Sequence, residues 1–133
     1  MDTTTFRIET GATPVVHDIS TQCADFVRGR ADGLLSVFVP HATAGIAILE
    51  LGAGSDTDLI RSFDRLLPAD DRWVHRHGTP GHGRSHVMPA LVAPSITVPC
   101  LGGRMALGTW QSVAVVDLNV DNAVREVRLS YLA

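Results

Sequence analysis

The sequence contains no lysine and only two cysteines, and both shortages narrow the chemistry open to the protein. Without lysine it cannot form a lysine Schiff base or supply the lysine of a phosphate-binding P-loop. Recognition of phosphate or carboxylate groups therefore falls to the 11 arginines, whose planar guanidinium groups bind these anions bidentately. A bias in genomic codon use accounts for the missing lysines equally well.

Cys23 and Cys100 lie far apart and outside any C-x-x-C motif, so we expect both to be buried and reduced, as in a cytoplasmic protein. No apolar run approaches the roughly 20 residues that a membrane span needs. The first residues lack the basic and apolar regions of a signal peptide. The net charge of -3 gives no electrostatic basis for binding nucleic acid.

Hydrophobic periodicity predicts an α+β fold with a mainly antiparallel sheet and two helices, formed by one domain over residues 1–133. One helix is predicted over 21–31, with Ser20 as its N-cap. The other is predicted over 55–67, with Ser55 and Asp58 forming a capping box and Pro68 ending it. Strands are expected at 6–8, 34–40, 46–51, 87–92, 95–99, 108–118 and 127–131.

Four of the six histidines fall within the segment 68–86, which has no periodicity: His75, His77, His82 and His86. Neutral imidazole is the commonest protein ligand for metals and a proton shuttle near neutral pH. Gly81, Gly83 and Pro80 argue against a helix around His82, and the segment lacks the glutamate of a zinc metalloprotease helix. We expect His86 to open a strand that faces a loop carrying His75. Such an arrangement can form a three-histidine metal site, and a solvated loop without any ligand is an equal alternative.

His41 and Glu50 are further candidates for acid–base or metal chemistry. His41 follows a predicted strand, and the N–H groups of Thr43 to Gly45 after it can form an anion-binding nest. The simpler interpretation is a turn histidine bonded to the backbone. Glu50 stands in an apolar strand, where a buried carboxylate needs a partner, although the solvated face of the strand is the commoner place for it.

Two other polar or aromatic features have structural interpretations. The residues Asp117, Asn119, Asp121 and Asn122 crowd the last predicted hairpin but lack the glycine and distal glutamate of a calcium loop. We interpret them as a tight turn, in which such residues are common. Trp110 is expected in the core.

Three motifs are similar to those of the YjbQ-like family of secondary thiamine-phosphate synthases. Residues 39–46 resemble its V-P-H-T-T-A-G-I segment. Residues 94–99 and 107–111 resemble its P-S-L-T-V-P and L-G-T-W-Q signature, and residues 66–71, followed by His75, resemble its R-L-V-P-E-D-D…Y-R-H stretch. The resemblance extends from about residue 33 to the end of the chain.

The resemblance implies a compact α+β fold with a β-sandwich-like core, a homotrimer, and a site near the subunit boundary. It implies a reaction that joins a pyrimidine pyrophosphate to a thiazole phosphate and releases pyrophosphate. His41, His75 and His86 are implied as metal ligands, with His41, Glu50 and His86 as catalytic residues. The implied substrate-binding residues are Thr43, Gly45, Arg84, Trp110 and Gln111. Zinc is the expected ion, and magnesium is the alternative for a pyrophosphate substrate.

The chain departs from the family pattern around the proposed site. Leu49 and Leu51 replace the asparagines that flank the family's acidic position, and residues 81–86 read G-H-G-R-S-H where the family commonly has G-N-A-D-A-H. Arg84 therefore reverses a charge, and His82 adds a potential ligand. Thiamine phosphate synthesis as a side activity, or a non-catalytic trimeric module that binds a metal or small anion, are the alternatives to a dedicated synthase.

Overall fold

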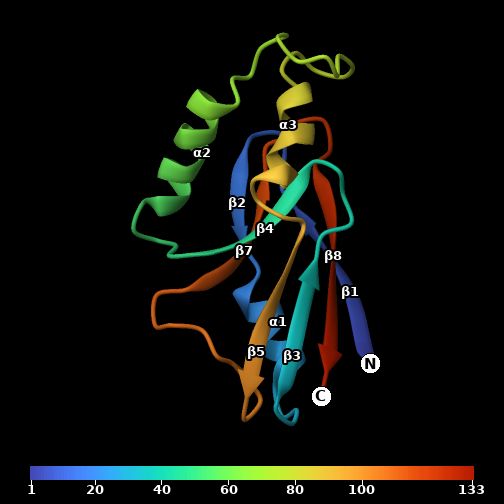
Figure 1. The fold of residues 1–133 in the computed structure, drawn as a ribbon, viewed down its shortest axis with the longest axis vertical. Helices are drawn as coiled ribbons and strands as arrows, with labels where there is room; N and C mark the ends of the chain where they lie inside the picture. The colour runs from blue at the N-terminus through green and yellow to red at the C-terminus, as the bar shows by residue number, and fades with distance from the viewer.

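Two antiparallel β-sheets form the core of the protein in the computed structural model, which describes all of residues 1–133 (Figure 1). The larger sheet has the strand order β1-β8-β3-β5-β6, and the smaller sheet has the order β2-β7-β4. The strands are β1 (Asp2–Glu9), β2 (Val15–Asp18), β3 (Gly33–Phe38), β4 (Ala44–Leu49), β5 (Ser95–Leu101), β6 (Arg104–Met105), β7 (Ser112–Asp117) and β8 (Val124–Leu132). This architecture confirms the predicted α+β fold with antiparallel sheets.

Three α-helices accompany the sheets, one more than the sequence predicts. They are α1 (Ser20–Val27), α2 (Ser55–Leu66) and α3 (Gly83–Val87), and a 3₁₀ helix over Met88–Ala90 follows α3. Helix α1 ends four residues before the predicted end, and Gly29 then adopts a positive φ of 74°. Helix α2 is close to its predicted range, but no side chain caps its N-terminus, so the expected capping box does not form. None of these helices is long and apolar enough to cross a membrane.

The smaller sheet is buried on both faces, which explains the continuous apolar run in β7. One face of β7, with Val113 and Val115, joins a cluster of 16 buried residues shared with the larger sheet and α1. The other face, with Val116, packs against Phe63 of α2 and Met88 of the 3₁₀ helix. Helices α2 and α3 therefore lie on the side of the smaller sheet that faces away from the larger one (Figure 1).

Two of the predicted strands need correction. The predicted strand 87–92 is helical or turn, because this segment packs Met88 onto the smaller sheet. The predicted strand 108–118 shortens to β7, and Trp110 lies before it in a turn with 73% of its surface exposed, so it is not a core residue. Strands β2 and β6 carry too few residues to show an alternating pattern.

Gly45 has a packing role in β4. A Cβ atom at this position would lie 2.1 Å from the carbonyl oxygen of Val92, so only glycine allows this close approach of two backbones. The amide of the next residue, Ile46, donates a hydrogen bond to the carbonyl of Ala93. This contact ties the segment after α3 to the smaller sheet and thereby positions α3.

Candidate metal centre

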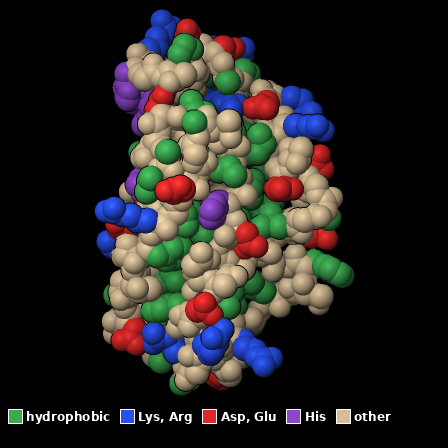
Figure 2. Space-filling view, turned by 180° about the vertical axis from the view of Figure 1, so that it is seen from behind, with side chains coloured by type: hydrophobic (Ala, Val, Ile, Leu, Met, Phe, Trp, Pro, Cys, Tyr) green, Lys and Arg blue, Asp and Glu red, His purple; other side chains and the backbone are tan.

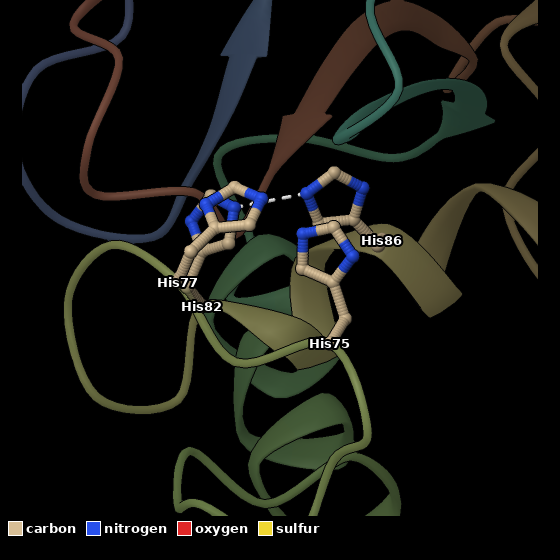
Figure 3. Close-up of side chains that lie close together, drawn as sticks. All are labelled: His75, His77, His82 and His86. Carbon is tan, nitrogen blue, oxygen red and sulfur yellow. Dashed lines mark hydrogen bonds between the residues drawn. The ribbon is translucent and has the colours of Figure 1, made fainter.

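Four histidine rings converge at the end of the molecule where the α2–α3 loop meets α3 (Figure 3). Their ligand atoms all lie within 4.8 Å of one another. His75 and His77 come from the loop, whereas His82 and His86 stand one helical turn apart at the start of α3 and within it. We call these four residues the histidine cluster. The ring centroids of His75 and His86 are 3.9 Å apart, and those of His77 and His82 are 4.8 Å apart.

Gly81 and Gly83 disfavour a helix in the sequence analysis, but in the structure they allow the loop to pack closely against the start of α3. Gly81 has a φ of +82° and lies against Ala69, so it turns the chain into α3. Gly83 begins α3 where a Cβ atom would lie 2.4 Å from the side chain of Trp73. The indole of Trp73 donates a hydrogen bond of 2.9 Å to the carbonyl of Pro68, which folds the loop back over α3. The expectation that His86 opens a strand is therefore wrong.

Asp121 determines the protonation pattern of His82. The Asp121 Oδ2 atom lies 2.7 Å from Nδ1 of His82, and a carboxylate can only accept, so Nδ1 of His82 carries the proton. The Nε2 atoms of His82 and His86 are 2.9 Å apart. Two lone pairs at this distance would repel, so in neutral rings Nε2 of His86 donates to Nε2 of His82.

The Asp121 carboxylate is itself held by a chain of hydrogen bonds that reaches the core. Its Oδ2 accepts the backbone amide of Thr79 at 3.1 Å, and its Oδ1 accepts the Thr79 hydroxyl. The Asp121 amide donates to Oδ1 of Asn119, and the Asn119 amide donates to Oδ1 of Asp117. Asp117 forms a bidentate pair with Arg125 at 2.6 and 2.9 Å, and both side chains are only 1% exposed. The hairpin that the sequence suggests to be a simple turn therefore supports the cluster.

Electrostatics keep the cluster ready to bind a cation. Partial burial and the neighbouring histidines lower the pKa of His75 and of His86 below the ordinary 6.5, because several positive rings repel one another. Hydrogen bonds from Thr79, and then from His82, hold the pKa of Asp121 below 3.8. Near neutral pH the cluster therefore presents the neutral imidazoles of His75 and His86 and the ionised carboxylate of Asp121.

The chemistry of the donor set fits zinc. In a tetrahedral zinc site with Zn–N bonds of about 2.0 Å, the ligand nitrogens lie about 3.3 Å apart. In the cluster the Nε2 atoms of His82 and His86 are 2.9 Å apart and all the ligand atoms lie within 4.8 Å of one another, so their spacing is close to the one that zinc requires. Imidazole nitrogen suits zinc, whereas magnesium prefers oxygen ligands.

A pocket of about 320 Å³ opens beside the cluster. It is lined mainly by polar side chains and glycines of the loop, including His75, His77, His82 and Arg76. In Figure 2 histidine side chains gather near the upper left of the molecule, with basic and acidic side chains above them. The pocket can hold a small polar molecule next to a bound cation.

The arginines around the cluster differ in their availability. Arg76 lines the pocket and uses only its Nε to bond the carbonyl of Trp73. Arg72 forms a bidentate pair with Asp70, and Arg84 donates through Nη1 to Asp64 and to the carbonyl of Leu67. The charge of Arg84 is thus paired with the half-exposed carboxylate of Asp64, and the Arg84 side chain itself is only 6% exposed.

His41 does not join the cluster. Its Nε2 accepts a 2.9 Å hydrogen bond from the backbone amide of Glu126, which lies in the part of β8 that extends beyond its pairing with β3. The His41 ring is therefore neutral, and its Nε2 takes the place of a backbone acceptor for this amide. Burial first, and then the charge of Arg125, lower the pKa of His41 below 6.5.

The metal-free protein should lose stability on acidification. For His41 the folded pKa lies below the unfolded value of 6.5, so the unfolded chain takes up the proton more readily. Stability is then full above pH 6.5, falls as the pH drops below it, and levels off below the folded pKa. We expect urea denaturation with EDTA to show a lower midpoint at pH 5.5 than at pH 7.5. His41→Gln should reduce this difference between the two midpoints. An unchanged difference would contradict the assignment of this pH dependence to His41.

The remaining predicted site residues lie outside the cluster. Glu50 is exposed in the loop after β4. The Thr43 hydroxyl accepts hydrogen bonds from Asn119 and Arg125, and no residue from 41 to 45 has the positive φ that an anion nest needs. Trp110 and Gln111 belong to the β6–β7 connection, where the Gln111 side chain accepts the amide of Gly108.

The three-histidine site expected from the sequence includes His75 and His86, and the structure places these two rings side by side. The expected ligand set does not include His77, although His77 belongs to the same dense histidine segment, and that density was the available signal. Asp121 lies 35 residues beyond His86 in the chain, and only the tertiary fold brings it to His82.

Comparison with known proteins gives a consistent picture. The family model for UPF0047 protein YjbQ-like matches residues 4–133. The UPF0047 protein Rv2556c of Mycobacterium tuberculosis is 54% identical over 132 residues, covering 99% of this chain and 98% of the relative. The UPF0047 protein YugU of Bacillus subtilis is 34% identical and covers 82% of this chain and 83% of its own length.

Solved structures share the fold. The hypothetical protein APE1520 from Aeropyrum pernix K1 superposes with a TM-score of 0.89 at 29% identity, covering 100% of this chain and 99% of that one. An uncharacterized conserved protein of the yjbq/upf0047 family from Clostridium acetobutylicum gives a TM-score of 0.86 at 25% identity, covering 97% and 99%.

Proposed function

This chain belongs to the YjbQ-like UPF0047 family, and from this premise we propose that it is a metal-dependent enzyme of small phosphorylated metabolites. The observation that carries the proposal is the histidine cluster, with four ligand nitrogens within 4.8 Å beside a polar pocket. The reaction that we propose joins a pyrimidine pyrophosphate to a thiazole phosphate. We also propose that the protein is a homotrimer in the cytoplasm.

The proposed reaction is a substitution at a methylene carbon. The thiazole nitrogen forms a bond to this carbon as the carbon–oxygen bond to pyrophosphate breaks, and pyrophosphate leaves with the electron pair. A divalent ion in the cluster supplies Lewis acidity for the charge that develops on the leaving group. Arg76 offers unpaired Nη groups at the pocket to bind phosphate oxygens.

The outer face of the larger sheet supports self-association. Leu34 pairs with Leu132 across β3 and β8, so both side chains lie on one face, and they are 45% and 49% exposed. Leu101, which is 60% exposed, continues this face on β5. An apolar patch of this kind typically marks a protein–protein contact. Light scattering of the purified protein measures its subunit number directly.

A non-catalytic module that binds a metal or a small anion is the second candidate. It is favoured by the positions of His41 and Glu50, which are two of the three residues expected to be catalytic. His41 has its Nε2 occupied by the Glu126 amide, and Glu50 lies outside the cluster. Such a module would bind its ligand without converting it to a product.

Turnover of the two precursors by purified untagged protein tests the proposal. We expect thiamine phosphate to form with zinc or magnesium, and the double variant His75→Ala/His86→Ala to lose this activity. His17→Ala is the matched control, because His17 lies in β2 and is absent from the cluster. If wild type makes no more product than the double variant, the enzyme is excluded, and retained metal binding then favours the module.

A further inference from the structure

We infer that Asp121 is a positioning residue of the metal centre, which holds His82 with its Nε2 atom toward the bound cation. The inference rests on the proposed metal site but not on the identity of the substrate. It assigns a role to the β7–β8 turn, which lies far from the histidine segment in the sequence and beside it in the fold.

The direction of the hydrogen bond carries the argument. His82 has two ring nitrogens, and its Nδ1–H group donates a hydrogen bond of 2.7 Å to the Asp121 carboxylate. The lone pair of Nε2 then points to the inside of the cluster, where His86 lies 2.9 Å away. A ligating histidine generally donates its other N–H to a carboxylate or carbonyl group, which selects the tautomer and increases ligand basicity. His82 already has this arrangement.

The carboxylate is fixed in place before any ion binds. Thr79 donates to both of its oxygen atoms, and the Asp121 backbone is tied through Asn119 to the buried Asp117–Arg125 pair. The His82 side chain is itself only 8% exposed. The pair is therefore preorganised, whereas His75 and His77 lie on the loop and are exposed.

Gly78 shows that the surrounding backbone is shaped around this contact. A Cβ atom at Gly78 would lie 2.6 Å from Oδ2 of Asp121 and 3.2 Å from Nδ1 of His82. Gly78 also has a φ of +74°, which disfavours other residues. A side chain at position 78 would enter the space between the loop and the hydrogen-bonded pair.

A double-variant cycle on zinc affinity tests the inference. Asp121→Asn preserves the shape of the side chain but removes its charge. We expect it to weaken zinc binding about 10–100-fold, which is the usual effect of mutating a hydrogen-bond partner of a ligating histidine. In the His82→Ala background the same change should alter affinity less than about 2-fold, because Asp121 then has no ligand to orient. Competition with a chromophoric chelator measures each affinity, and cobalt(II) absorption reports the coordination. Asp32→Asn, an equivalent change at an exposed carboxylate that accepts the Gly102 amide, is the control.

Two results would overturn the inference: an unchanged affinity in Asp121→Asn, or an equal loss with and without His82. The second result would mean that Asp121 merely supports the loop. If Asp121→Asn does not fold, Gly78→Ala disturbs the same pair and enters the same cycle. The outcome is independent of catalysis, since a coupled loss of affinity without thiamine phosphate formation supports the inference while excluding the proposed enzyme.

Discussion

Arg125→Met is expected to lower the free energy of unfolding by about 3–5 kcal/mol, because it leaves the Asp117 carboxylate buried without its cation. The two side chains are 1% exposed and form a bidentate pair. Arg125 also donates to the Thr43 hydroxyl, so this bond is lost as well. Urea denaturation of the metal-free protein at pH 7.5 measures the change.

Arg128→Met is the matched control on the same strand. Arg128 is 48% exposed and lies 3.9 Å from Glu126, so its loss should cost less than about 1 kcal/mol. Adding Asp117→Asn to Arg125→Met should recover part of the stability, since the unpaired charge is removed. A loss below about 1 kcal/mol in Arg125→Met would show that the buried pair does not hold the β7–β8 turn.

His86→Ala is expected to lower zinc affinity by more than about 100-fold, because it removes a metal ligand. Mutation of a residue that only hydrogen-bonds to a ligand already costs about 10–100-fold. His86 stands in α3 with its Nε2 inside the cluster, and alanine is the best helix former, so the fold should remain. Zinc should correspondingly stabilise wild type against heat but not the variant. At a free zinc concentration 100 times Kd, this stabilisation is about 2.7 kcal/mol.

Thermal denaturation with graded zinc, alongside a chelator competition, measures both effects. His17→Ala should behave as wild type, because His17 lies in β2 outside the cluster. Equal zinc affinity in His86→Ala and wild type would place any bound ion elsewhere in the protein.

The sheets were predictable because burial leaves a clear period in the sequence. In β8, Val127, Leu129 and Tyr131 face the core while the residues between them do not. The length and bounds of α2 also follow from its pattern of apolar residues. The β7 segment was harder to delimit, since burial on both faces removes the alternation.

The local structure of the histidine segment was not predictable from propensities. Gly81 and Gly83 normally disfavour a helix, but here they allow close contacts with Ala69 and Trp73 that exist only in the folded protein. The role of His41 likewise depends on a strand end meeting the Glu126 amide. Tertiary contacts decide both cases, and a single sequence does not display them.

X-ray absorption of untagged protein reconstituted with one equivalent of zinc tests the metal centre most directly. We predict a first shell of three or four imidazole nitrogens at about 2.0–2.1 Å, with the nitrogen count reduced in His75→Ala. The spectrum of hydrated zinc, with oxygen ligands only and no imidazole scattering, would contradict the assignment of the histidine cluster as a metal site.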